Sequence, residues 1–248
     1  MQKPLSESKQ ATSALVLEVK AHGKILGGFA ALLWLIQIVN GLIFQGGLAG
    51  LGIHPRSLYG LVGILFAPFI HVSFAHLIAN TVPLLVLGWL VMLRQKRDLI
   101  TVSAIAALVG GLGTWLIAPA LTVHVGASIL IFGYLGYLLF RGIFERRFWP
   151  IVGSIVTFFL YGGALFGVMP GQVGVSWQGH LFGLIGGILA ARLLRTRQAT
   201  TTTLAKSPAR RRIPAIDGPR ARLPAETDED QDAELEAELA AAKKRYTR

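Results

Sequence analysis

The chain has 248 residues, of which 53% are hydrophobic and 15% charged, and its mean hydropathy is +0.57. This composition excludes an ordinary soluble domain, and the absence of cysteine excludes disulfides, a thiol nucleophile and a thiolate metal site. The formal net charge of +11 comes from basic residues at the ends of apolar stretches and in the C-terminal part. These positions indicate a role in membrane topology and in contacts with anionic lipid, and we expect no nucleic acid as a partner.

The apolar stretches predict the fold class. Residues 1–23 contain only a short apolar patch at 14–17, too little for the core of a signal peptide, so we expect them to remain as a cytoplasmic N-terminal segment. Later stretches reach the roughly 17 to 25 residues that a bilayer requires, except that the fourth is short; they are 25–44, 75–93, 99–117, 125–140, 150–167 and 176–194. The sequence predicts an all-α membrane protein with a six-transmembrane-helix bundle over residues 24–195.

Residues 196–248 have a different composition. They are polar, contain four prolines and few large apolar residues, so we expect a cytoplasmic, mostly disordered tail. Within it, residues 232–245 place acidic residues before basic ones, which suits a short charged helix. A solvated tail is the favoured interpretation, and a helix that binds a partner is the alternative.

The basic residues predict the orientation of the chain. They occupy the N-terminal segment, the loops at 94–98 and 141–148, and the tail, whereas the intervening loops 45–74, 118–124 and 168–175 have Arg56 as their one charged residue. Short loops rich in Lys and Arg remain cytoplasmic. Both termini are therefore expected inside and the three other loops outside, and a short chain without an organelle signal fits a bacterial plasma membrane.

Polar residues inside membrane helices are costly and usually mark a site. With this topology His76, Asn80, Ser128 and His180 all fall within about two turns of the outer boundary. His76 and Asn80 are four residues apart, so both can point toward one place from the same helix. The sequence therefore predicts one polar site that opens to the outside, with His71 as a structural hydrogen-bond partner.

Small residues predict which helices approach each other. Glycine allows close helix packing in lipid, and it recurs in the two helices that contain Ser128 and His180, at Gly126, Gly133 and Gly136 in one and at Gly179, Gly183 and Gly187 in the other. Ser128 and His180 can then meet, and a neutral histidine within reach of a serine is the usual base for a serine nucleophile.

Acidic residues are scarce in the apolar region. Between Glu18 and Asp217 the only ones are Asp98 and Glu145, and both are predicted in cytoplasmic loops. A serine hydrolase built here must therefore use a Ser–His dyad without a carboxylate. The same scarcity excludes a membrane aspartyl protease and an H-E-x-x-H zinc protease. Asn80, His76 and the backbone N–H of Ser128 are candidate donors to an oxyanion.

Three motifs resemble the rhomboid intramembrane serine proteases: H-x4-H-x3-N in "HVSFAHLIAN", G-x-S-x3-F-G in "GASILIFG" and G-H-x2-G in "GHLFGLIGG". The resemblance covers most of the predicted six-helix core. It implies that transmembrane protein substrates are cut in or near the bilayer, and that no cofactor or metal takes part. It also implies residue roles: Ser128 as nucleophile, His180 as general base, His76 and Asn80 as oxyanion donors, Phe132 packed against His180, and His71 as a supporting residue.

One position departs from this family pattern, because members commonly have glycine directly after the nucleophile and this chain has Ile129. A β-branched residue there is expected to narrow the pocket or to hold the backbone differently. The alternative function is consequently a catalytically inactive rhomboid-like protein that binds membrane helices without cleaving them. A small transporter would require polar residues at the midplane, and His124, four residues before Ser128, is a weaker candidate for the base.

Overall fold

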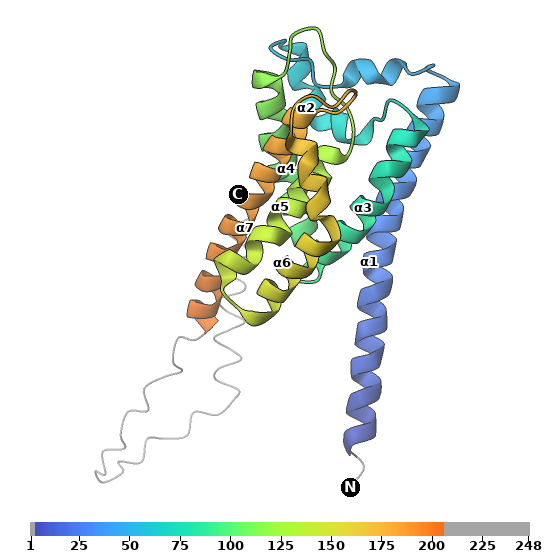
Figure 1. The fold of residues 1–248 in the computed structure, drawn as a ribbon. Helices are drawn as coiled ribbons and strands as arrows, with labels where there is room; N and C mark the ends of the chain where they lie inside the picture. Colours follow the sequence, from blue (N-terminus) through green and yellow to red (C-terminus); the bar gives the residue numbers. More distant parts are fainter. Residues whose placement is uncertain (1–2, 206–248) are drawn as a thin grey trace, which may run out of the picture. The chain divides into compact units, whose positions relative to one another are not determined.

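The computed structural model describes the backbone of residues 3–205 and the side chains of residues 12–195, and this part of the chain is helical (Figure 1). Its α-helices are α1 (Lys3–Leu42), α2 (Gly63–Phe66), α3 (Phe74–Met92), α4 (Lys96–Ile117), α5 (Ser128–Glu145), α6 (Phe148–Tyr161) and α7 (Trp177–Ala205). Short 3-10 helices occupy Gly47–Leu51, Tyr59–Leu61, Ala67–Phe69 and Gly162–Val168. The all-α prediction is confirmed for these residues.

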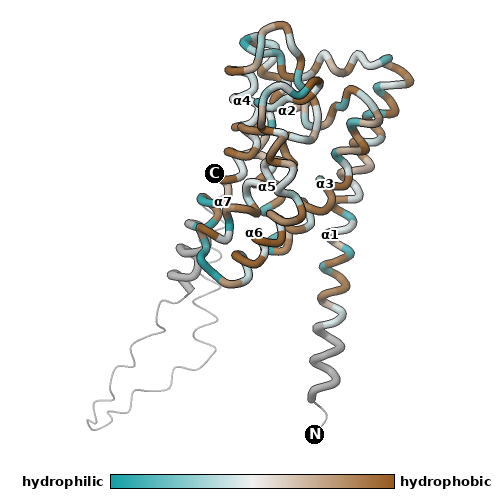
Figure 2. Tube along the Cα trace, viewed as in Figure 1, coloured by the Kyte–Doolittle hydropathy of each residue, from teal (hydrophilic) through white to brown (hydrophobic). Residues whose placement is uncertain are grey.

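Five helical segments are long and apolar enough to cross a membrane: Thr12–Leu42, Phe74–Met92, Lys96–Ile117, Ser128–Glu145 and Phe148–Val168. In Figure 2 hydrophobic residues predominate along these segments and hydrophilic residues gather at their ends and loops. The sixth predicted stretch, 176–194, is helical within α7 but is not among the five. Its polar side chains, Gln178, His180 and Arg192, lower its hydropathy.

Two helices are longer than predicted. α1 begins at Lys3 rather than near residue 25, because the preceding residues are rich in the strong helix formers Ala, Leu, Lys, Glu and Gln. α7 continues to Ala205, past the predicted start of the tail at residue 196. The remainder of that tail, including the helix expected at 232–245, lies outside the described residues.

α5 forms the centre of the bundle. It packs against α3, α4, α6 and α7, while α1 packs against α3 at the edge (Figure 1). Tyr134, Leu135 and Tyr137 are almost completely buried. The helix begins with Ser128, so the most deeply packed helix of the described chain carries the predicted nucleophile.

Glycines allow α5 and α7 to pack backbone against backbone. A Cβ atom added to Gly187 would overlap the carbonyl oxygen of Gly133, and one added to Gly136 would overlap that of Leu184. Similar contact occurs at Gly183, where an added Cβ would lie 2.5 Å from the carbonyl oxygen of Ile129. The predicted approach of these two helices is therefore present in the structure.

We expect Gly187→Ala to lower the free energy of unfolding by about 1–3 kcal/mol, because the methyl group forces two backbones apart. Thermal unfolding in detergent measures the effect. Gly153→Ala in α6 is the matched control, since an added Cβ there meets nothing within 4 Å, and it should leave stability unchanged or slightly higher. Equal midpoints of thermal unfolding for the two variants would contradict the close packing of α5 and α7.

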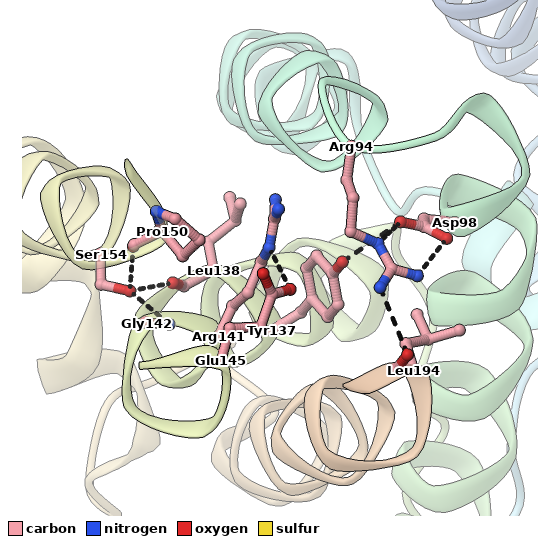
Figure 3. A network of polar contacts seen from close by, with 10 residues as sticks. All are labelled: Arg94, Asp98, Tyr137, Leu138, Arg141, Gly142, Glu145, Pro150, Ser154 and Leu194. Atoms are coloured by element: carbon pink, nitrogen blue, oxygen red, sulfur yellow. Dashed lines mark hydrogen bonds and ion pairs between the residues drawn. The ribbon is translucent and has the colours of Figure 1, made fainter. Parts of the chain in front are cut away.

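A buried ion pair joins the helices at the end of the bundle opposite to Ser128. Asp98 accepts hydrogen bonds from Arg94 Nε at 2.5 Å and Nη2 at 2.9 Å, and from the hydroxyl of Tyr137 at 3.3 Å (Figure 3). Arg94 also donates to the carbonyl of Leu194 in α7 at 3.3 Å. This network connects the end of α3 with the start of α4, with α5 and with α7.

The placement of the two acidic residues in loops was wrong in detail. Asp98 lies in the first turn of α4 and is fully buried, and Glu145 is the last residue of α5, paired with Arg141 at 2.7 Å. Both lie at the opposite end of the bundle from the predicted site. Because Asp98 lies beside Leu194, fourteen residues along α7 from His180, about 20 Å of helix separates it from that histidine.

At the end of the bundle where α5 begins, the long segment between α1 and α3 is fixed to the segments around it. Ile53 and His124 form an isolated antiparallel bridge with backbone hydrogen bonds of 2.9 and 3.1 Å. Arg56 donates to the carbonyls of Leu116 and Ala118 at 3.1 and 2.8 Å. These carbonyls end α4 and lack intrahelical partners, so Arg56 caps the helix and holds the loop in place.

Candidate functional site

Ser128 begins α5 and follows a sharp turn. Gly126 has φ +127°, a conformation that favours glycine, and its N–H donates to the carbonyl of Ala67 at 2.9 Å. As the first residue of a helix, Ser128 has a backbone N–H without an intrahelical acceptor. The turn therefore places a half-buried hydroxyl beside the positive end of a helix dipole.

His180 lies in the first turn of α7, and its ring is held on two sides. Its Nδ1 is 2.9 Å from the carbonyl oxygen of Gly167. Because a carbonyl only accepts, Nδ1 carries the proton and Nε2 of the neutral ring is an acceptor. The ring stacks on Phe132 with a centroid separation of 4.1 Å and an interplanar angle of 11°.

Gly167 was not predicted as a site residue from the sequence. A backbone carbonyl leaves no signal in side-chain identity, and only the fold shows that the 3-10 helix Gly162–Val168 brings it to His180. A Cβ added to Gly167 would lie 3.0 Å from both His180 Nδ1 and Phe132 Cζ. Glycine at this position therefore permits the close approach of the imidazole and its stacked neighbour.

His76 and Asn80 project from α3 toward the turn before Ser128. A Cβ added to Gly126 would lie 2.7 Å from His76 Cε1, 3.0 Å from His76 Nε2 and 3.8 Å from Asn80 Nδ2. Asn80 is buried, and its amide nitrogen donates to the carbonyl of His76 at 3.1 Å. Two nitrogen-bearing side chains thus lie beside the backbone that leads into Ser128.

His71 is completely buried behind this turn. Its Nε2 accepts from the N–H of Ala127 at 3.3 Å, and its ring meets that of His76 edge to face at 5.1 Å. Burial, with a smaller contribution from nearby His76, lowers the pKa of His71 to about 4, so the ring is neutral at physiological pH. His71 contacts the residue before Ser128 and supports the turn.

One cavity of about 480 Å³ brings five of the six predicted site residues together: His76, Asn80, Ser128, Phe132 and His180 all line it. Its remaining walls are mostly apolar or carry hydroxyl groups and include Val72, Pro83, Leu135, Tyr161 and Thr122. His71 is the one predicted site residue that does not line it. No cluster of potential metal ligands occurs among the described residues.

His124 also lines this cavity, but both of its ring nitrogens have other partners. Nδ1 lies 2.7 Å from Ser176 Oγ, and Nε2 lies 2.8 Å from Thr122 Oγ1. A general base needs a ring nitrogen that is free to accept the proton of the nucleophile. Nε2 of His180 makes no hydrogen bond within the described part of the chain, whereas both ring nitrogens of His124 are engaged.

Ile129 points away from the cavity. Its side chain is buried with Ile53 and Ala67 and does not line the cavity. The surrounding glycines provide the space, since a Cβ added to Gly110 would lie 2.5 Å from Ile129 Cγ2, and one added to Gly179 would lie 3.2 Å from Cγ1. The expected narrowing of the pocket was therefore wrong, and the residue fills a slot between α4 and α7.

Comparison with known proteins adds to this geometry. The Rhomboid domain family model matches residues 58–197. An uncharacterized protein of Mycobacterium tuberculosis is 44% identical over 197 residues, covering 76% of this chain and 81% of that protein, and one of Mycobacterium leprae is 46% identical over 184 residues, covering 71% and 72%. A Bacillus subtilis protein named "Putative rhomboid protease YdcA" is 30% identical over 127 residues, covering 50% and 62%.

Proposed function

Because the chain belongs to the rhomboid family, we propose that it is an intramembrane serine endopeptidase that hydrolyses peptide bonds in or near transmembrane helices of membrane protein substrates. Ser128 and His180 form its catalytic dyad. The supporting observation is the single cavity that both residues line, in which a hydrogen bond to Gly167 leaves His180 Nε2 free as an acceptor.

In this mechanism His180 Nε2 takes the proton of Ser128 as Oγ attacks the scissile carbonyl carbon. The Gly167 carbonyl holds the proton on Nδ1 and stabilises the imidazolium that forms, which is the role a carboxylate has in a triad. His180 then returns the proton to the leaving amine, and water hydrolyses the acyl-enzyme in a second cycle of the same steps. Stacking on Phe132 keeps the ring in one orientation.

The tetrahedral intermediate needs hydrogen-bond donors where its negative charge develops. The amide of Asn80, the imidazole of His76 and the backbone N–H of Ser128 surround the turn at Gly126. The dipole of α5 adds a favourable field at its first residue. We assign these three groups to the oxyanion hole.

We expect Asn80→Ala to lower kcat by about 100-fold, the usual cost of losing one oxyanion donor. Activity remains because His76 and the Ser128 N–H still donate. Cleavage of a membrane-reconstituted substrate measures the loss. Thr157→Ala in α6 is the control, since that buried hydroxyl bonds only to Gly153 of its own helix, and an equal loss there would argue against a specific role for Asn80.

The membrane arrangement is part of the proposal. Residues 24–195 form a six-helix bundle in which α7 is the sixth span, and residues 1–23 and 196–248 are cytoplasmic. Both termini then lie inside a bacterial plasma membrane, in accord with the basic residues at the inner loops, and the cavity opens to the outside. No cofactor or metal takes part.

An inactive rhomboid-like protein that binds helices was the alternative suggested by Ile129. The side chain of this residue lies outside the cavity, in a slot provided by Gly110 and Gly179. Ser128 and His180 both line that cavity. Ile129 therefore no longer favours the inactive alternative.

The test is cleavage of a single-span membrane protein reconstituted with the purified chain in proteoliposomes. Product masses locate the cleaved bond. We expect a cut in or near the outer part of the transmembrane helix, because the cavity lies at that level in the proposed topology. A panel of such substrates left intact by folded protein, or cut only on the cytoplasmic side, would overturn the proposal.

A further inference from the structure

A chain of hydrogen bonds links the loop before Ser128 to the start of α7. His124 Nδ1 lies 2.7 Å from Ser176 Oγ, and Nε2 lies 2.8 Å from Thr122 Oγ1. Thr122 Oγ1 donates to the carbonyl of Pro119 at 2.6 Å, and Ser176 Oγ accepts from the N–H of Gly179 at 3.3 Å. These hydrogen bonds therefore connect the first turn of α7 with the turn that follows α4.

When His124 is neutral, each of these hydrogen bonds can have only one direction. The carbonyl of Pro119 only accepts, so Thr122 uses its single hydrogen there and must accept from His124 Nε2–H. Nδ1 then has no hydrogen and accepts from the hydroxyl of Ser176. Burial lowers the pKa of His124, which favours the neutral ring that this order requires.

His124 is itself fixed in space. Its backbone N–H and carbonyl both pair with Ile53, at 3.1 and 2.9 Å. Its side chain thus extends from a braced loop segment, four residues before Ser128, to a residue four before His180. Both His124 and Ser176 line the same cavity as the dyad.

The contact at Ser176 is coupled to the position of His180 through the helix. The carbonyl of Ser176 accepts from the backbone N–H of His180 at 3.0 Å, and its hydroxyl caps the N–H of Gly179. A shift of Ser176 would therefore move the first turn of α7 and the imidazole that it carries. The distance between a base and its nucleophile strongly affects proton transfer.

We propose that His124 is a positioning residue, which through Ser176 holds the start of α7 against the loop before Ser128 and so sets the position of His180 relative to the nucleophile. The inference rests on the proposed function, since it concerns the rate at which Ser128 is deprotonated. His124 touches neither the reacting atoms nor Ser128 in this role. A contribution to fold stability alone would not change kcat selectively.

The experiment compares His124→Ala, Ser176→Ala and the double variant in the substrate cleavage assay. We expect each single variant to lower kcat by about fivefold, the factor that one net hydrogen bond is worth, with KM unchanged. The double variant should be no slower than the slower single variant, because both break the same chain. Ser176→Thr keeps the hydroxyl and should retain the wild-type rate.

His54→Ala is the matched control. This histidine lies in the first outer loop, where its Nε2 bonds to the carbonyl of Gly50 and its ring packs against Tyr59. It does not line the cavity, so its loss should leave kcat unchanged. Thermal unfolding of every variant shows whether the folded fraction has decreased. If a variant is less stable, the comparison of kcat between Ser176→Ala and Ser176→Thr tests the inference.

A second measurement does not depend on proteolysis. In a Ser128→Ala background, His124→Ala should increase amide hydrogen exchange in the first turn of α7, and His54→Ala should not. Unchanged exchange together with unchanged kcat would overturn the inference, as would additive losses in the double variant. If the wild-type chain cleaves no substrate, the proposed function fails, and faster exchange would still support the hydrogen-bond chain.

Discussion

Ser128→Ala is expected to reduce substrate cleavage to background, a loss on the order of 10⁵-fold or more, because no other group can form the acyl-enzyme. His180→Ala is expected to have nearly the same effect. Nucleophile and base act as one unit, and the double variant should be no slower than either single one. Product formation from a reconstituted single-span substrate measures these rates.

Ser103→Ala is the control for this experiment. It removes the same atom from a half-buried serine of α4, whose hydroxyl bonds to Leu99 and Tyr134 away from the cavity. Its cleavage rate should equal that of the wild-type chain. Cleavage by Ser128→Ala at the wild-type rate would show that another group is the nucleophile.

The largest expected effect on stability is at Asp98. Asp98→Asn leaves the guanidinium of Arg94 without its counter-charge in a place where the carboxylate is fully buried and the arginine side chain is only 7% exposed. Removing one member of a buried ion pair typically costs about 3–5 kcal/mol. The network in Figure 3 also joins α4, α5 and α7 to the turn that follows α3, so we expect a lower midpoint of thermal unfolding in detergent.

Glu145→Gln provides the comparison. Its partner Arg141 is 18% exposed, and this pair lies within one helix, so the remaining charge can reach water. A more exposed pair of this kind is worth about 1 kcal/mol or less. If Asp98→Asn lowered the midpoint of thermal unfolding no more than Glu145→Gln does, the stabilising role assigned to the network around Asp98 would be contradicted.

The close packing of α5 and α7 could be predicted from the sequence because it depends on the spacing of glycines along the two helices. Gly133 and Gly187 are the small residues that let backbones touch, and the structure brings them together. The grouping of Ser128, His180, His76 and Asn80 was predicted from the pattern of basic loops, which assigned these residues to one depth. These four residues line one cavity.

Other features depend on contacts that a sequence pattern does not encode. Gly167 acts through a carbonyl, which every residue type carries, and His124 was interpreted alone because its hydroxyl partner Ser176 lies fifty-two residues away. The direction of Ile129 depends on the space left by Gly110 and Gly179 in two other helices. Asp98 was assigned to a loop because it ends a charged run at 94–98. Its burial depends on a contact with Tyr137 in α5, which the local sequence does not indicate.

The two ends of the bundle are joined in different ways. At the end away from Ser128, the buried ion pair between Arg94 and Asp98 joins the helices. At the end that carries Ser128, loop backbone and the hydrogen bonds of His124 join the segments, and Arg56 caps α4.

The most direct test of the central claim is covalent labelling of the purified protein with a serine-reactive fluorophosphonate, with the modified residue located by mass spectrometry. An activated serine is predicted, so the wild-type chain should be labelled at Ser128 and the His180→Ala variant should not. Folded wild-type protein that remains unlabelled at Ser128, or a His180→Ala variant labelled equally fast, would contradict a Ser128–His180 dyad.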